Sequence, residues 1–215
     1  MEITWYGHSC FRLAERSKAS VVTDPFDDHL GLAVPKLRAE IVTISHLARG
    51  HSYVEGVRGV QRVIHGAGEY EIGGVFITGV AMHNTARKPP KPNIAYVFDF
   101  DGLRVAHLGD LDHIPPQTVI EALESVHVAL VPVGGGGLNA TQAVEVISLL
   151  EPNYVIPMHY QLPNSTLALD PLECFLREMG VSRVQQEQVF RVSVSNLPEQ
   201  TQVVVMEQST RCKSE

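Results

Sequence analysis

Short apolar runs of strand length recur along the whole chain, and only in its second half do they alternate with helical patterns. Before residue 82 these runs occupy residues 3–6, 10–14, 19–23, 41–44, 62–64 and 75–81. Gly73-Gly74 separates two runs and predicts a hairpin turn. Asp101-Gly102, between runs at 94–100 and 103–108, is a stronger hairpin signal, because both residue types tolerate a positive φ. The first half is therefore predicted to be mainly β-sheet.

Two helices are predicted in the second half. Asn139 followed by Gln142 makes a capping box at the start of the first helix, which we expect over 139–151. The second helix should begin at Asp170-Pro171, with the proline in its first position, and stop at Gly180. Alternation of strands and helices predicts an α/β fold.

Length and composition favour one globular domain. The other strand-like runs of the second half lie at 126–133, 154–157, 190–194 and 202–206. The chain has 215 residues, of which 44% are hydrophobic and 19% charged, an ordinary globular composition. We expect one domain over residues 1–207 and a frayed polar tail over 208–215.

Charge and the amino-terminal sequence bear on partners and location. A net charge of −7 argues against a nucleic-acid partner. The chain contains no apolar run long enough to span a membrane, so no membrane partner is expected. The sequence begins without the pattern of a signal peptide, which favours a cytoplasmic location. The basic stretch Arg87–Lys91 is interrupted by prolines and is predicted to be a solvated loop.

Four of the apolar runs lead into side chains that can bind a metal ion. These side chains are His46, His83, Asp110 and His159. Because ligands gather at the carboxyl ends of strands in α/β sheets, we expect the four to converge. Three imidazoles and a carboxylate suit zinc, manganese or iron. Any one of these histidines alone would more often be an ordinary loop residue, but the repeated context favours a site.

Five motifs occur in an order that is typical of one family. They are Ile3-Thr-Trp-Tyr-Gly-His-Ser-Cys-Phe11, Thr23-Asp-Pro-Phe26, Leu108-Gly-Asp110, Val131-Pro-Val-Gly-Gly135 and Ile156-Pro-Met-His-Tyr160. Over about residues 3–180 the chain resembles the metallo-β-lactamase superfamily, in particular the small single-domain hydrolases grouped with ascorbate-6-phosphate lactonase. The resemblance implies a four-layer αβ/βα sandwich, with two mixed sheets face to face, helices outside and a metal centre at one edge.

The chain departs from that family in one loop. Family members carry a His-x-His-x-Asp-His signature, and here the segment reads His46-Leu-Ala-Arg-Gly-His51. Ala48 therefore replaces a histidine and Gly50 replaces the aspartate. By the resemblance, metal one would keep His46 and His83 while losing its middle histidine.

Metal two, again by the resemblance, would keep His51 and His159, and Asp110 would bridge both ions and hold the nucleophile. A catalytic zinc needs about three protein ligands, so a weakened site for one ion is expected. Asp112 and His113 are candidates to replace the lost ligands, and a solvated loop is the favoured alternative for them.

Other residues are assigned smaller roles. By the resemblance Asp24 orients the loop 46–51, and a turn residue that merely ends its strand is an equal alternative. His8 lines the cleft or, as we favour, makes a structural hydrogen bond. Gly134 and Gly135 belong to a glycine run that could present N–H groups to an anionic substrate. A plain turn between strand and helix is the favoured interpretation of that run.

Two functions remain open from the sequence. The first is a metal-dependent hydrolase of an ester, lactone or phosphodiester in a small molecule such as a phosphorylated sugar. The second is a catalytically silent relative that keeps the fold for ligand binding or assembly, which the losses at Ala48 and Gly50 favour. Relatives often assemble, so the resemblance leaves room for a homo-oligomer.

Overall fold

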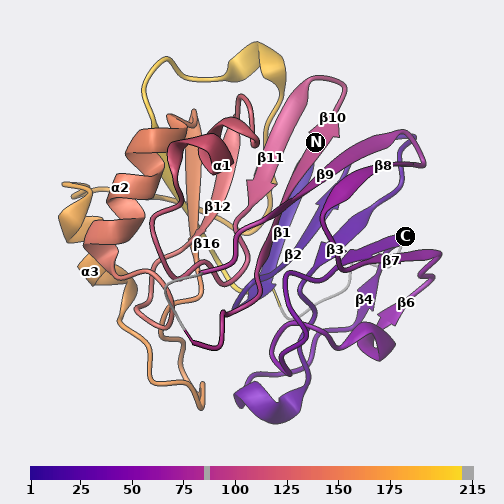
Figure 1. Ribbon diagram of the computed structural model, residues 1–215, viewed down its shortest axis with the longest axis horizontal. Coiled ribbons are helices and arrows are strands. Elements are labelled where there is room, and N and C mark those ends of the chain that lie inside the picture. The colour runs from indigo at the N-terminus through magenta and orange to yellow at the C-terminus, as the bar shows by residue number, and fades with distance from the viewer. Residues whose placement is uncertain (85–87, 210–215) are drawn as a thin grey trace.

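Two β-sheets lie face to face in the computed structural model of this chain, which describes residues 1–84 and 88–209 (Figure 1). The order of strands in the first sheet is β15 (Phe190–Arg191), β1 (Glu2–Gly7), β2 (Cys10–Ala14), β3 (Val21–Thr23), β5 (Ile41–Thr43) and β7 (Arg62–Ile64). The order in the second is β14 (Gln185–Glu187), β16 (Gln202–Met206), β13 (Tyr154–Met158), β12 (Val128–Pro132), β11 (Leu103–His107), β10 (Ile94–Phe100), β9 (Val75–Ala81) and β8 (Gly68–Ile72). A small separate ladder pairs β4 (Leu37–Arg38) with β6 (Val57–Arg58).

Apolar side chains fill the space between the sheets. Every residue of β3, β5, β12 and β13 is buried, as expected for strands that read as unbroken apolar runs. The ring of Phe11 on β2 lies 6.2 Å from that of His107 on β11, which joins the two sheets. Tyr96 on β10 donates its hydroxyl to the carbonyls of Ile44 (3.1 Å) and Ile64 (3.3 Å), at the ends of β5 and β7.

Both predicted hairpins are present. Asp101 and Gly102 have φ values of 55° and 88° between β10 and β11. Gly73 and Gly74, at 55° and 78°, join β8 to β9. Positive φ at two successive turn residues is what glycine and aspartate permit, so the local sequence determined these turns.

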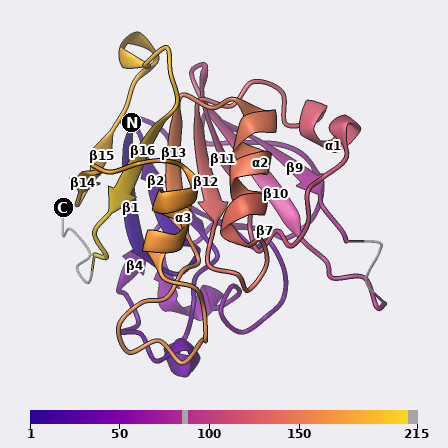
Figure 2. The same ribbon diagram turned by 90° about the vertical axis from the view of Figure 1, so that its left-hand side faces the viewer.

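The described α-helices are α1 (Gln117–Glu121), α2 (Ala140–Leu150) and α3 (Leu172–Glu178), and short 3-10 turns span Asp28–Leu30 (η1), Val54–Gly56 (η2) and Val194–Asn196 (η3). The predicted capping box of α2 forms between Asn139 and Gln142. α3 begins later than predicted, because Pro171 has an extended backbone and caps the helix from outside. α2 and α3 lie side by side on the outer face of the eight-stranded sheet (Figure 2).

Strand directions bring many chain segments to one edge of the sandwich. β3 and β5 are parallel, and so are β11, β12 and β13. β9 runs the same way as β11, because each pairs antiparallel with β10. β1 likewise runs the same way as β3, because each pairs antiparallel with β2. The residues that follow the carboxyl ends of these strands are therefore placed to meet.

The end of the described chain is attached to the first sheet. Gln208 Nε2 donates to the Tyr6 carbonyl (3.0 Å), and the Ser209 N–H donates to that of Trp5 (2.8 Å). The rest of the tail expected from residue 208, residues 210–215, lies outside the described residues. Among the described helices, none has both the length and the apolar character that a membrane span requires.

Candidate metal centre

Two overlapping groups of metal-capable side chains lie at this edge. One contains His8, His51 and His159, and the other His46, His51 and Asp110, with the ligand atoms of each group within 4.8 Å of one another. The structure thus brings together four of the five predicted ligands. It adds His8, which the sequence analysis favoured as a structural residue.

The carboxylate of Asp24 contacts the Nδ1 side of the His51 ring. Its Oδ2 lies 2.8 Å from His51 Nδ1 and accepts the Ser45 hydroxyl at 2.6 Å, and its Oδ1 accepts the Ser45 N–H at 2.7 Å. A carboxylate can only accept here, so His51 Nδ1 carries the proton and Nε2 carries a lone pair, which faces His8 Nε2. Ser45 Oγ also lies 3.1 Å from His46 Nδ1. Asp24 thus contacts both ends of the segment 45–51, and its role in orienting the loop 46–51 stays a prediction.

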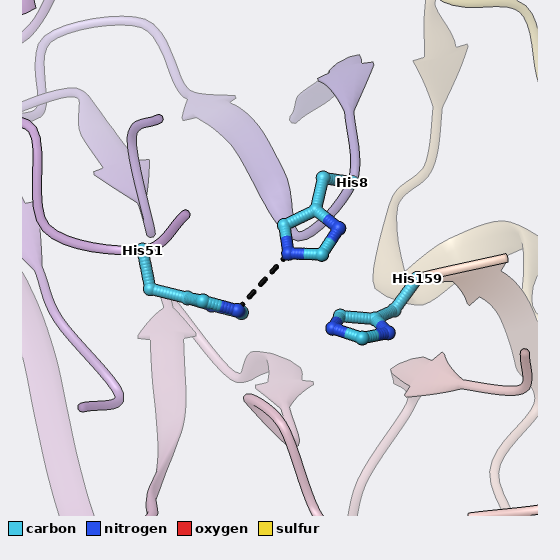
Figure 3. Close-up of side chains that lie close together, drawn as sticks. All are labelled: His8, His51 and His159. Atoms are coloured by element: carbon cyan, nitrogen blue, oxygen red, sulfur yellow. Dashed lines mark hydrogen bonds between the residues drawn. The ribbon is translucent and has the colours of Figure 1, made fainter. Parts of the chain in front are cut away.

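His8 and His159 are joined through both side chain and backbone. His8 Nε2 lies 3.0 Å from His51 Nε2, and the rings of His8 and His159 have centroids 4.1 Å apart (Figure 3). The carbonyl of His8 accepts the N–H of His159 at 3.2 Å and the indole N–H of Trp5 at 3.0 Å. His8, Asp24 and His159 have φ of 51°, 39° and 56°, which is uncommon outside glycine and is found at functional sites.

Asp110 is held between an asparagine and a lysine. The Asp110 N–H donates to Asn93 Oδ1 at 2.9 Å, and Asn93 Nδ2 donates to the Leu108 carbonyl at 2.9 Å. Lys91 Nζ donates to Asp110 Oδ2 at 2.5 Å, so Lys91 is not the solvated loop residue that the prolines predicted. The other oxygen, Oδ1, lies 3.5 Å from His159 Nε2.

Burial governs the protonation of this cluster. It lowers the pKa of His8 and of His51 well below the usual value near 6.5, and the neighbouring histidines lower both further. Burial also lowers the pKa of His159. Burial would raise the pKa of Asp110, but His159, His51 and Lys91 outweigh it and hold that pKa below its usual range. Neutral imidazoles and an ionised carboxylate are the forms that bind a metal ion.

These pKa shifts predict that the metal-free protein loses stability as the pH falls. Burial lowers the pKa of His107 as it does that of His51, so below pH 6.5 the unfolded chain binds protons that the folded chain does not. The free energy of unfolding should fall between pH 7.5 and 5.5 by on the order of 1 kcal/mol for each such histidine. The lowered pKa of Asp110 contributes only near pH 4 and below, outside this range.

Urea unfolding in the presence of a chelator measures this dependence. In the His107→Gln variant the free energy of unfolding should depend less on pH, because one titrating histidine has been removed. Glutamine can still donate to the Ser9 carbonyl, as His107 does at 2.9 Å, so the hydrogen bond is kept. Equal stability of the wild type at the two pH values would contradict the prediction.

The glycine run, residues 134–137, packs tightly between His159 and Asp110, the two candidate ligands that follow strands of the second sheet. A Cβ on Gly134 would lie 2.2 Å from the His159 carbonyl oxygen, and one on Gly137 would lie 2.3 Å from that of Leu111. A Cβ on Gly135 would lie 2.5 Å from Asp170 Oδ2, and the Gly135 N–H already donates to Leu138. Close packing therefore accounts for glycine at these positions, and anion binding there stays a prediction.

His83 lies apart from the two groups. It is exposed, its Nδ1 accepts the N–H of Asn93 at 3.2 Å, and its role as a ligand stays a prediction. With His46 and His65 it lines a cavity of about 400 Å³ whose other walls are mainly apolar. A larger hollow of about 720 Å³ beside α2 contains no member of either group.

Asp112 and His113 contact each other, with Oδ1 and Nδ1 3.2 Å apart. Among the described residues neither belongs to a group of three metal-capable side chains. A replacement for the lost ligands is instead offered by His8, whose signal was available in the sequence: it follows the first strand-like run as His159 follows a later one. Lys91 gave no such signal, because its position depends on how a proline-rich loop folds back.

The residues of the first group and Asp110 fit one divalent ion better than two. One of their buried atoms, Asp110 Oδ1, has no hydrogen-bond partner within the described chain and lies 3.5 Å from His159 Nε2, and a bound ion is one explanation for such an atom. A second ion beside His46 would have fewer available ligands. Ala48 is exposed and offers no ligand, and Lys91 already occupies Asp110 Oδ2.

Comparisons with known proteins show the family to which this chain belongs. A family model described as a beta-lactamase superfamily domain matches residues 2–159. A metal-dependent hydrolase from Natranaerobius thermophilus is 27% identical over 221 residues, covering 85% of this chain and 98% of that protein. One from Archaeoglobus fulgidus is 29% identical over 198 residues, covering 74% and 83%.

Solved structures extend the likeness to the fold. A Thermotoga maritima protein described as a zinc-dependent hydrolase of the metallo-beta-lactamase superfamily superposes with a TM-score of 0.76 and 35% identity, covering 95% of this chain and 97% of that one. A metallo hydrolase from Ignicoccus hospitalis, with a TM-score of 0.61 and 21% identity, covers 96% and 95% and shares the fold. By its matched domain, its sheets and its relatives, this chain belongs to the metallo-β-lactamase superfamily.

Proposed function

We propose that this chain hydrolyses an ester, lactone or phosphodiester bond in a small molecule, such as a phosphorylated sugar or lactone, with one ion of zinc, manganese or iron. One juxtaposition carries the proposal: His51, His159 and Asp110 meet at a sheet edge where His46 lines a cavity of about 400 Å³. The metal-dependent hydrolases among its relatives support the reaction class.

Each residue of the cluster has a part that follows from its contacts. His51, His159 and Asp110 would hold the ion, which supplies Lewis acidity and so makes water a nucleophile near neutral pH. Asp24 keeps the His51 proton on Nδ1. Asp110 Oδ1, the oxygen that has no hydrogen-bond partner within the described chain, is the one that we assign to the ion. Lys91 balances the charge on Oδ2 of the same carboxylate.

The cavity supports a small substrate. Its volume of about 400 Å³ falls within the range of small-molecule pockets. Its polar groups, His46, His65 and His83, would orient the substrate, and the net charge of −7 disfavours a polyanion. We therefore propose a small-molecule partner and neither a nucleic acid nor a membrane. A cytoplasmic location and a homo-oligomer stay predictions.

A second candidate is a silent, ligand-binding relative, and the Lys91 contact favours it. An ammonium group on Asp110 Oδ2 supplies a positive charge where, by the family pattern, an ion would bind. The cavity beside His46 would then bind a ligand without cleaving it.

Metal content and hydrolysis measured on one preparation distinguish the two candidates. The tag-free protein, purified without chelator, should contain near one equivalent of metal by mass spectrometry. It should also hydrolyse bis(p-nitrophenyl) phosphate, p-nitrophenyl acetate or a δ-lactone. A chelator should remove the activity and Zn²⁺ or Mn²⁺ should restore it.

Two histidine variants test whether the metal and the activity depend on the proposed site. His159→Ala should lose metal and at least about 100-fold in rate, whereas His29→Ala, an exposed histidine in η1, should resemble the wild type. Hydrolysis that neither the chelator nor His159→Ala affects would contradict the proposal. A well-folded protein that cleaves none of the substrates with metal added would favour the ligand-binding candidate.

A further inference from the structure

We propose that His8 is a metal ligand that takes the place of the missing motif aspartate, so that His8, His51 and His159 bind one ion together. This inference rests on the proposed use of an ion at this edge and adds the identity of its third nitrogen ligand. It explains how a chain with glycine at position 50 can still have a complete ligand set.

His8 lies next to Gly50, the position at which the family motif has its aspartate. A Cβ built on Gly50 would lie 3.3 Å from His8 Nε2 and 3.1 Å from Leu30 Cδ2. Both contacts are tight, so a side chain at position 50 would require His8 and Leu30 to move by a few tenths of an ångström. The glycine at position 50 thus leaves the space beside His8 Nε2 open.

The backbone fixes His8 beside the other two ligands. Its carbonyl accepts hydrogen bonds from the His159 N–H and the Trp5 indole, as described above. His8, His51 and His159 are 4%, 3% and 5% exposed, so all three imidazoles converge in a nearly closed space (Figure 3). Three buried, neighbouring imidazoles are a common set of zinc ligands.

The distances require only a modest adjustment. Two nitrogens bound to one tetrahedral zinc at about 2.0–2.1 Å lie roughly 3.3 Å apart. The Nε2 atoms of His8 and His51 are 3.0 Å apart, and the three ligand atoms of the group lie within 4.8 Å of one another. Side-chain rotations of about an ångström would bring all three to an ion.

An exchange of ligands between positions 8 and 50 tests this inference. Zn²⁺ affinity is measured by competition with a chromophoric chelator, and Co²⁺ absorption reports the ligand set. His8→Ala should bind Zn²⁺ at least about 10- to 100-fold more weakly than the wild type. Gly50→Asp alone should not gain affinity, because its side chain meets His8 and Leu30.

The double variant His8→Ala with Gly50→Asp should recover most of the lost affinity. Its Co²⁺ spectrum should differ from that of the wild type, because a carboxylate replaces an imidazole. His29→Ala is the matched control. His8→Gln tests whether a loss of affinity in His8→Ala comes from misfolding. The glutamine amide can still hydrogen-bond to His51 but is a poor zinc ligand. This variant should fold like the wild type, by circular dichroism, and still lose Zn²⁺.

Wild-type affinity in a folded His8→Gln variant would overturn the inference, and so would a wild type that binds no Zn²⁺. A failure of the proposed function gives a different result. In that case Zn²⁺ binding would depend on His8 as expected, while the loaded protein hydrolyses none of the substrates.

Discussion

The Asp110→Asn variant is expected to lose detectable hydrolysis and to bind Zn²⁺ more than about 100-fold more weakly than the wild type. The substitution preserves the shape of the side chain and the N–H bond to Asn93, but it removes the carboxylate that lies against His159. It also leaves the Lys91 ammonium without its counter-charge. Titration calorimetry and kcat/KM on the most reactive substrate measure the two losses.

A second substitution separates loss of the ligand from the unpaired lysine. Adding Lys91→Met to Asp110→Asn removes the unpaired, partly buried charge, so it should recover stability without recovering Zn²⁺ affinity. Asp112→Asn, two residues along the same loop, serves as the control and should keep both properties. If Asp110→Asn retained near-normal affinity and rate, Asp110 would be neither a ligand nor a catalytic residue.

Substitutions of Asp24 should have the largest effect on stability. Asp24 is 1% exposed and accepts bonds from the Ser45 N–H, the Ser45 hydroxyl and His51. Asp24→Ala removes the acceptor of the Ser45 N–H and of His51 Nδ1 and leaves the Ser45 hydroxyl only His46 Nδ1, so the free energy of unfolding should fall by about 3–5 kcal/mol. Urea unfolding measures this change, with the exposed Asp28→Asn as control.

Asp24→Asn should show the metal-binding effect with less loss of stability. An amide N–H in place of Oδ2 would face His51 Nδ1 and favour the tautomer whose proton is on Nε2. That proton occupies the lone pair a metal ion needs, so Zn²⁺ affinity should fall about 10- to 100-fold. Unchanged affinity in Asp24→Asn would mean that Asp24 supports the fold but does not orient His51.

Much of the fold was predictable because its signals are local. The Asp101-Gly102 turn and the Asn139 cap depend on residues next to one another in sequence, and both formed as expected. β4 and β6 were missed, since strands of two residues are too short to show a pattern. Pro171 was misplaced by one position, because its fixed φ suits a cap as well as the first helical residue.

The site was predictable where a strand determines the position of a side chain. His159 follows β13 and Asp110 follows β11, two parallel strands that flank β12, so the pattern sufficed to bring them together. His83 also follows a strand, with one residue between, yet it lines the cavity and belongs to neither group. Lys91 reaches Asp110 from a loop that has no periodic pattern, and only the tertiary structure shows that contact.

The pairing of Lys91 with Asp110 and of His8 with His51 has a consequence for how the protein matures. In a chain such as a zinc finger, the ligands have no other partners and the polypeptide cannot fold until the ion arrives. Here two of the charged or polar groups at the centre already have partners. Folding can therefore finish first and loading can follow, so the supply of ions around the finished protein decides which metal it takes up.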